Sequence, residues 1–489
     1  PRPPVLVPAE PVPPVSSGPP ARGDATDPAL GAFPAEIRAP APVVVAQAPA
    51  PKPVPDRWHR LADALDRCPA DDVIARTVCQ ESLRIEQCEG YWGRVAPCPV
   101  RRYREYRDAL AAHYDRVQVL YAAKANGNLA LMRALAQQGA GADVFSSGEL
   151  HLALEAGMAP EKLLFNGSSK TPADLQLAVE KGVKVSLDSL DELHQLDATA
   201  KAAGKTATVS FRVNPALKVP THPKIATGLA TSKFGIPHEQ IPAAYREALA
   251  CKNIRPVGIH CHIGSQILDI EPFARAAEVM VRIAKELTEM GVKLEFIDLG
   301  GGLGIPYHHD TDPAPTAEDY AAKVVPIFKA GVEACGISPE LWVEPGRSLV
   351  ADSTVLLTRV NSTKKAHKRF ANVDAGFNLL IRPAMYDAYH EVIVANRADA
   401  PLTTEYTVTG PICESGDILA PDRKLPELAA GDILAVLDAG AYGYAMSSQY
   451  NGRPRCPEVL IKGTQAALMR RGETLADITA AMERPAWQD

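Results

Sequence analysis

The sequence predicts an α/β fold in which a (β/α)₈ barrel is followed by a mostly antiparallel β domain and preceded by a disordered proline-rich extension. Between residues 101 and 352, eight apolar stretches end at polar or glycine-rich turns and alternate with amphipathic helical patterns. After about residue 352 the pattern becomes β-rich. At the amino terminus, 17 of the 43 prolines fall within residues 1–55, a composition that cannot pack a core.

These changes of pattern divide the 489 residues into four segments. We expect a disordered tether over residues 1–56, a cysteine-containing segment over residues 57–99, a cofactor-binding barrel over residues 100–352, and a β domain with a carboxyl-terminal helix over residues 353–489. Hydrophobic residues at 46% and charged residues at 22% are ordinary for a globular enzyme, and a net charge of −6 gives no support for nucleic-acid binding. No stretch approaches the roughly 18 apolar residues of a membrane span.

Four of the nine cysteines lie close together in the second segment. The spacings of eleven, nine and ten residues between Cys68, Cys79, Cys88 and Cys98 do not fit a zinc site, and we expect no metal there. Two disulfides or four free thiols are the alternatives. Disulfides would suit an oxidising compartment.

The barrel should begin with a helix over residues 101–114, after which strands and helices alternate. Helices such as residues 128–139 and 271–291 lie between the apolar stretches. An open doubly wound sheet fits less well, because its dinucleotide-binding fingerprint is absent from the sequence. The eight strands are expected at residues 118–124, 142–146, 162–167, 183–189, 208–215, 257–264, 294–302 and 341–348.

The β domain should contain strands at residues 354–363, 368–376, 405–413 and 432–440. The last segment, residues 464–483, has Leu468, Leu475 and Ile478 at helical spacing and is expected to be a helix.

Lys124 ends the first apolar strand, so its amine should lie at the mouth of the barrel. A lone lysine is usually a surface residue. Here the apolar strand before it indicates a desolvated amine, and desolvation lowers the pKa of an amine and makes it a usable nucleophile towards a carbonyl group.

Three consecutive glycines, Gly300, Gly301 and Gly302, offer a loop whose backbone NH groups a phosphate can approach closely. Such a run can also simply end a strand. Arg347, in the motif EPGR, could add a charge-assisted contact to the phosphate.

Glu344 ends the last barrel strand, where a carboxylate could pair with the nitrogen of a pyridine ring and keep it protonated. The alternative is a salt bridge with Arg347. His260 and His262 are two positions apart on one strand and should share a face, so that one could stack on a planar ring, unless both are ordinary core residues.

In the β domain, Cys413 and Glu414 place a thiol beside a carboxylate in the glycine-containing loop GPICESGDI. Together with the lysine, the glycine run, the histidines and EPGR, this loop indicates a site for pyridoxal 5′-phosphate.

The same motifs resemble those of the fold-type III, alanine-racemase-like decarboxylases, most closely the diaminopimelate decarboxylases. The resemblance extends from about Arg101 to Ile461. It rests on motifs that follow the family's order: YAAKANGN, HCHIGSQ, DLGGGLGIPY, EPGRSLV, DAGFNLLIRPAMYDAYH, GPICESGD and LDAGAYGYAMSSQYNGRP.

The resemblance implies a role for each matching residue. Lys124 would carry the cofactor, His262 would stack on its ring and Glu344 would meet its nitrogen. Asp143 matches a residue near the lysine, and Arg382 and Tyr386 match residues that bind the far carboxylate of the substrate. Cys413 and Glu414 match residues that enter the active site from the partner subunit. The positions that match phosphate-binding residues are Ser265, Gly301, Gly302, Arg347 and Tyr442, the last of which could also reach the substrate.

A homodimer with shared active sites is therefore implied, acting on meso-2,6-diaminopimelate to give L-lysine and carbon dioxide. Cys413 is the candidate for placing the proton that replaces the lost carboxyl group. Arg382 and Glu414 complement the far carboxylate and ammonium of that substrate. Ornithine has no far carboxylate, so Arg382 favours diaminopimelate over a decarboxylase of another basic amino acid.

The chain departs from the family upstream of the barrel, where a β-domain strand is replaced by the proline tether and the cysteine segment. Either residues 57–99 substitute for that strand, or an envelope-type fragment has been joined to the catalytic region. A catalytically silent homologue that acts as an interaction protein is the alternative from another class. We expect a cytoplasmic enzyme, where its substrate and cofactor are made, although the clustered cysteines leave an envelope origin for residues 1–99 open.

Overall fold

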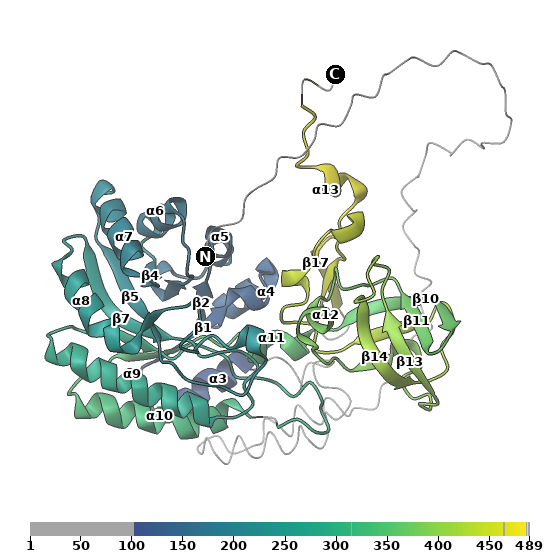
Figure 1. Cartoon of the computed structure of the whole chain (residues 1–489), viewed down its shortest axis with the longest axis horizontal. Helices are drawn as coiled ribbons and strands as arrows, with labels where there is room; N and C mark the ends of the chain where they lie inside the picture. Colours follow the sequence, from purple (N-terminus) through teal and green to yellow (C-terminus); the bar gives the residue numbers. More distant parts are fainter. Residues whose placement is uncertain (1–101, 314, 463–464, 486, 488–489) are drawn as a thin grey trace, which may run out of the picture. The chain divides into compact units, whose positions relative to one another are not determined.

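A computed structural model describes residues 102–313, 315–462, 465–485 and 487 of the chain (Figure 1). The expected tether, the cysteine segment and the four clustered cysteines lie outside the described residues. None of the described helices is both long enough and apolar enough to cross a membrane.

Eight parallel strands close into a barrel, which confirms the predicted fold class. Each strand pairs with the next, and β1 pairs with β9, which completes the ring. A short strand, β6 (Ile236–Pro237), adds to β5 outside the ring. The barrel strands are β1 (Val117–Ala122), β2 (Gly141–Val144), β3 (Leu163–Phe165), β4 (Lys184–Leu187), β5 (Ala207–Asn214), β7 (Ile254–Cys261), β8 (Phe296–Asp298) and β9 (Glu340–Val343).

Helices connect the barrel strands and cover them. Neighbouring helices α9, α10 and α3 pack side by side (Figure 1). Local sequence sets where a helix begins and ends. Helix α6, for example, begins at a capping box between Thr171 and Asp174 and ends at Gly182, which is in the left-handed conformation. The helices are α3 (Arg102–Ala111), α4 (Leu129–Ala136), α5 (Ser147–Glu155), α6 (Pro172–Lys181), α7 (Leu190–Ala202), α8 (Ile241–Ala250), α9 (Glu271–Glu289), α10 (Ala317–Ala334) and α11 (Arg347–Val350).

The β domain is built on a six-stranded sheet in the order β12-β15-β10-β11-β13-β14, in which only β11 and β13 pair in parallel. The four predicted strands are present, and β12 and β14 were not predicted. The elements are β10 (Leu356–Lys365), β11 (Arg369–Val373), α12 (Arg382–Tyr386), β12 (Val392–Val394), β13 (Thr404–Thr409), β14 (Ile418–Leu425) and β15 (Ile433–Val436).

The carboxyl-terminal segment corrects one prediction. Gln465–Arg470 forms strand β17, which pairs antiparallel with β16 (Glu458–Lys462), and the helix is limited to α13 (Leu475–Thr479). Leu468 and Leu475 are 64% and 74% exposed, so the apolar spacing does not mark a buried helical face. Cross-strand pairing with β16 overrides the helical period.

The barrel and the β domain have separate hydrophobic cores. Two contacts connect the end of β1 to the loop that follows β15: the backbone NH of Tyr442 donates to the carbonyl oxygen of Ala125 at 2.8 Å, and the amide of Asn126 donates to the carbonyl oxygen of Gly440 at 3.2 Å. The carboxyl ends of the barrel strands therefore lie next to the β domain.

Candidate active site

Lys124 lies in a short 3₁₀ helix (Ala123–Ala125) directly after β1, and Asp143 lies in β2 beside it. The amine of Lys124 forms an ion pair with the buried carboxylate of Asp143, and it lies 4.4 Å from the centre of the Phe145 ring. Burial alone would lower the pKa of Lys124, but the charges of Asp143 and Glu344 raise it above its ordinary value. The expectation that desolvation lowers this pKa is therefore wrong: two carboxylates outweigh burial.

Asn166, at the end of β3, connects two of the carboxylates. Its side-chain amide donates to Asp143 at 2.7 Å and to Glu344 at 2.8 Å. Burial, followed by the charge of Glu344, raises the pKa of Asp143. Sequence reasoning did not single out Asn166, although its place at the carboxyl end of a barrel strand was a usable signal.

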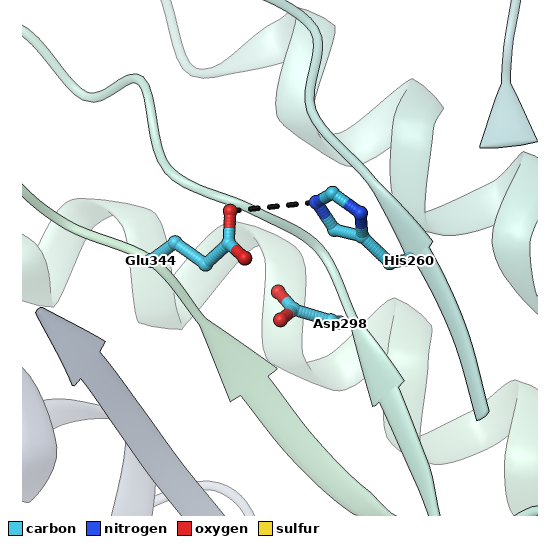
Figure 2. Close-up of side chains that lie close together, drawn as sticks. All are labelled: His260, Asp298 and Glu344. Carbon is cyan, nitrogen blue, oxygen red and sulfur yellow. Dashed lines mark ion pairs between the residues drawn. The ribbon is translucent and has the colours of Figure 1, made fainter. Parts of the chain in front are cut away.

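Glu344, His260 and Asp298 converge inside the barrel, as Figure 2 shows. Nε2 of His260 lies 3.4 Å from a carboxylate oxygen of Glu344, and Nδ1 of His260 lies 3.0 Å from the hydroxyl of Ser186. Burial alone would raise the pKa of Glu344, but His260 and then Lys124 hold it at about 2. Burial and the charge of Glu344 raise the pKa of Asp298 well above its ordinary value.

These three side chains offer ligand atoms within 4.8 Å of one another, a grouping that a metal ion could also use. Their chemistry favours a ring nitrogen instead. Burial and the charge of Glu344 favour the protonated form of Asp298, and a protonated carboxyl group is a poor metal ligand. Glu344 stays ionised, as an acceptor opposite a protonated pyridine nitrogen must be.

His262 lies just beyond the end of β7, and the glycine turn after β8 packs against it. Its Nδ1 accepts a hydrogen bond from the backbone NH of Gly301 at 3.2 Å, so the proton of the neutral ring is on Nε2. Burial and the charge of Lys124 hold the pKa of His262 well below its usual range. His260 faces Glu344 and His262 faces the glycine turn, so the two histidines have different surroundings.

The turn after β8 requires glycine because neighbouring backbone atoms leave no space for a Cβ atom. A Cβ atom at Gly301 would lie 2.0 Å from the carbonyl oxygen of Glu344, and one at Gly302 would lie 2.3 Å from that of Gly264. Gly302 also has a φ of +118°, which side chains disfavour. The close approach of backbone to backbone brings the glycine run next to Glu344 and His262.

Arg347 begins α11 and is 6% exposed. Its guanidinium donates to the hydroxyl of Ser265 at 2.9 Å and to the hydroxyl of Tyr307 at 2.8 Å, and it lies 4.8 Å from the centre of the Tyr442 ring. The suggested salt bridge with Glu344 does not form between these residues, because Glu344 meets His260 and Asn166 instead.

Arg382 begins α12 and is 4% exposed. One guanidinium nitrogen lies 2.7 Å from Nε2 of His390, and the guanidinium carbon lies 4.5 Å from the centre of the Tyr307 ring. Burial lowers the pKa of Arg382 to about 10. Tyr386, at the other end of α12, has its ring 6.0 Å from that of His222.

Cys413 and Glu414 lie at the exposed tip of the loop between β13 and β14. The amide of Asn451 lies 3.2 Å from the sulfur of Cys413, and the hydroxyl of Tyr450 donates to Glu414 at 2.6 Å. At the base of the loop, buried Asp417 accepts backbone hydrogen bonds from Ile412 and Phe377, each at 2.7 Å. The loop has a fixed base, and among the described residues its tip bonds only to others of the β domain.

The structure thus brings ten of the thirteen predicted residues into two connected groups and leaves Tyr386, Cys413 and Glu414 outside them. Sequence reasoning missed Asn166, Tyr307 and His390, and also Arg212, a buried barrel residue whose guanidinium lies 4.3 Å from the centre of the Phe234 ring. The first group surrounds Lys124 and Glu344, and the second surrounds Arg347 and Arg382. The roles of these residues remain predictions.

Comparison with known proteins agrees with this geometry. Residues 100–351 match the family model of the pyridoxal-dependent decarboxylases, pyridoxal binding domain. Diaminopimelate decarboxylase of Archaeoglobus fulgidus is 54% identical over 380 residues, covering 78% of this chain and 90% of the relative. The crystal structure of diaminopimelate decarboxylase from M. jannaschii in complex with L-lysine is similar with a TM-score of 0.74 and 39% identity, covering 78% of this chain and 89% of that one. The matches span most of each relative.

Proposed function

The chain belongs to the diaminopimelate decarboxylases, a family of pyridoxal-dependent enzymes, and we propose that it converts meso-2,6-diaminopimelate to L-lysine and carbon dioxide, the last step of lysine biosynthesis by this route. Lysine-bound relatives of the same fold support this reaction. The sections of chain that carry it are the barrel and the β domain.

Two buried arginines are the observation that carries the choice of substrate. Arg347 and Arg382 are 6% and 4% exposed, and neither forms an ion pair with a carboxylate in the part of the chain that the structure describes. A buried charge without a counter-charge is costly, so such a site is built for two anions. The cofactor phosphate supplies one, and the far carboxylate of diaminopimelate supplies the other.

The residues around Lys124 fit pyridoxal 5′-phosphate. The chain offers an amine at Lys124, a phosphate-binding pair in Arg347 and Ser265, and an ionised carboxylate at Glu344 for the ring nitrogen. Nε of Arg347 is buried without a hydrogen-bond partner among the described residues, as expected in a pocket shaped for a polar guest. When bound, the cofactor supplies a ring that accepts the electron pair left by departing carbon dioxide.

Asp143 prepares Lys124 to carry the cofactor. The amine must lose a proton before it attacks a carbonyl group, and the ion-paired Asp143 is the nearest acceptor. Because the pKa of Asp143 is raised by burial and by Glu344, its carboxylate takes that proton more readily than an exposed aspartate would.

Glu344 and His262 have different proposed roles towards the pyridine ring of the cofactor. Glu344, ionised and held by Asn166 and His260, keeps the ring nitrogen protonated and the ring able to accept electrons. His262, whose pKa is held low, would stay neutral and would exclude water from one face of a bound ring.

The proton that replaces the carboxyl group would come from Cys413 of a second subunit. Cys413 and Glu414 are exposed and bond to Asn451 and Tyr450 rather than to the Lys124 group, as expected if they serve another copy of the chain. The proposed enzyme is a homodimer with shared sites, in which Glu414 meets the far ammonium of the substrate. We place it in the cytoplasm, where the substrate and the cofactor are made.

An absorbance spectrum and a product assay test the reaction. Purified chain with pyridoxal 5′-phosphate should show a cofactor band and should form lysine and carbon dioxide from meso-diaminopimelate in equal amounts. Lys124→Ala should lose the covalent band and reduce kcat by roughly 10⁴-fold or more, as removal of a nucleophile does. Lys201→Ala, an exposed lysine of α7, is the matched control. A band without lysine formation would reject the substrate assignment.

A further inference from the structure

Arg382 is predicted to bind the far carboxylate of the substrate. Two side chains contact its guanidinium, and the proposed reaction gives neither of them a role. His390 bonds to its guanidinium at 2.7 Å, and the Tyr307 ring lies 4.5 Å beneath it. Both side chains are buried, with His390 fully buried and Tyr307 5% exposed. Their rings are themselves in edge-to-face contact, with centres 5.3 Å apart.

The hydrogen bonds of His390 determine its tautomer. Its Nδ1 lies 2.8 Å from the carbonyl oxygen of Leu437, which can only accept, so Nδ1 carries the proton. Nε2 is then a lone pair that can only accept, and Arg382 donates to it. A protonated His390 could not accept this bond. Burial together with the charge of Arg382 lowers the pKa of His390 to about 3, so the acceptor persists at neutral pH.

Tyr307 separates the two arginines. Its hydroxyl accepts from Arg347 at 2.8 Å, while its ring face meets Arg382. The face of an aromatic ring attracts a cation, so Tyr307 holds Arg382 without neutralising its charge. The Arg347 guanidinium is thereby held beside Ser265, where it would meet the cofactor phosphate, and Arg382 keeps its charge unpaired by any carboxylate among the described residues.

We propose that His390 and Tyr307 are positioning residues that orient Arg382 towards the far carboxylate of the substrate, and that this arrangement sets the preference for amino acids that carry such a carboxylate. The inference rests on the proposed function, because it assumes that Arg382 binds that group. An arginine held by a histidine lone pair and an aromatic face keeps its full charge, whereas an arginine held by an aspartate would already be paired.

Ligand selectivity of the cofactor-loaded enzyme gives a direct test. L-Lysine and 1,5-diaminopentane share the amine chain and differ by one carboxylate, so their ratio of dissociation constants measures what Arg382 contributes. Titration of the cofactor absorbance supplies both constants. We expect the ratio to favour L-lysine and to fall roughly 10- to 100-fold in His390→Asn, the effect of losing a hydrogen bond made to a charged group.

Two amides separate the roles of the two ring nitrogens. The amide of His390→Asn reaches only the Nδ1 position, whereas the longer amide of His390→Gln places an acceptor near Nε2. His390→Gln should therefore recover most of the selectivity, and the loss in His390→Asn should appear in KM for diaminopimelate more than in kcat. A His390→Asn enzyme with the wild-type ratio would overturn the proposal.

Tyr307 provides a second test that does not depend on the His390 variants folding. Tyr307→Phe keeps the ring under Arg382 and removes the hydroxyl that meets Arg347, so it should weaken cofactor retention while it keeps the selectivity ratio. Tyr307→Leu removes the ring face and should lower the ratio. Equal ratios in the Phe and Leu variants would contradict the role of the ring.

Arg382→Met distinguishes failure of this inference from failure of the proposed function. If Arg382→Met abolishes the preference for L-lysine while His390→Asn and Tyr307→Leu do not, Arg382 binds the carboxylate without their help and only the positioning roles fall. If the unmodified enzyme shows no preference for L-lysine, the assignment of Arg382 in the proposed function is wrong.

Discussion

The Lys124 pocket and the Cys413 loop both present reactive side chains, and they hold them in opposite ways. In the pocket, Asp143, Asn166 and Glu344 are buried and bonded to one another. In the loop, Cys413 and Glu414 are exposed, and within the described part of the chain their side chains meet nearby side chains of the β domain. The pocket is organised within one chain, whereas the loop presents its groups outward.

This difference indicates which part of the site one chain can form alone and which part needs a second chain. Buried carboxylates with shifted pKa values are arranged before any ligand binds, since their partners are already in place. An exposed thiol gains a controlled environment only when another surface covers it. We therefore expect the pocket to hold the cofactor by itself and the loop to act on a neighbouring subunit.

Mixing of two inactive variants is the sharpest way to break this comparison. Lys124→Ala lacks the pocket amine and Cys413→Ala lacks the loop thiol, and each should lose most activity alone. Co-expressed in equal amounts, half of the dimers are mixed and each mixed dimer has one intact site, so about a quarter of the wild-type activity should return. Lysine formation by the purified mixture measures this. No recovery, with both variants dimeric by mass, would mean that each site uses its own loop.

Glu344 and Asp298 test whether the pocket depends on the charge states of its carboxyl groups. Glu344→Gln removes the ionised partner of the ring nitrogen and should lower kcat by roughly 10²- to 10³-fold, the scale of lost proton control. Asp298→Asn should have a much smaller effect, because an amide resembles the protonated carboxyl group that the raised pKa implies. Steady-state kinetics with cofactor-saturated protein provides the comparison. Equal losses in the two variants would show that Asp298 is also needed as an anion.

Acid should destabilise the pocket through His390. Its pKa of about 3 in the folded chain lies below the ordinary value of 6.5, so between these values the unfolded chain binds more protons at this residue. Stability should fall as pH decreases from about 6.5, by at most ~1.4 kcal/mol per pH unit from this group. Denaturant midpoints between pH 7 and pH 4 should decline less steeply in His390→Asn. Parallel curves would contradict the shifted pKa.

The smallest effect is expected at the loop tip. The Tyr450 hydroxyl donates to Glu414, and this acceptor raises the pKa of Tyr450 to about 12. Because both groups are exposed, Tyr450→Phe should leave the midpoint of thermal unfolding close to that of the unchanged chain. Thermal unfolding is a sufficient measurement. A midpoint lowered as far as that of a pocket variant would mean that the tip is structurally as important as the pocket.

Local sequence was enough to predict most of the fold. Each barrel strand is a short apolar run that ends at a polar or glycine-rich turn, and all eight were predicted. The helical prediction for residues 464–483 was wrong for a specific reason. The spacing of Leu468 and Leu475 satisfies a helix, but Gln465–Arg470 pairs with β16, a partner that local spacing does not reveal.

The sequence by itself determined the barrel, the family and the identity of most candidate site residues, because strand periods and contiguous motifs are local properties of the chain. Only the tertiary structure decided how those residues interact. Lys124, Asn166 and Glu344 follow three different barrel strands. Arg382 contacts His390 within the β domain and Tyr307 of the barrel. Charge states and tautomers follow from such distant contacts, since burial and neighbouring charges set them and neither is encoded next to the residue in the sequence.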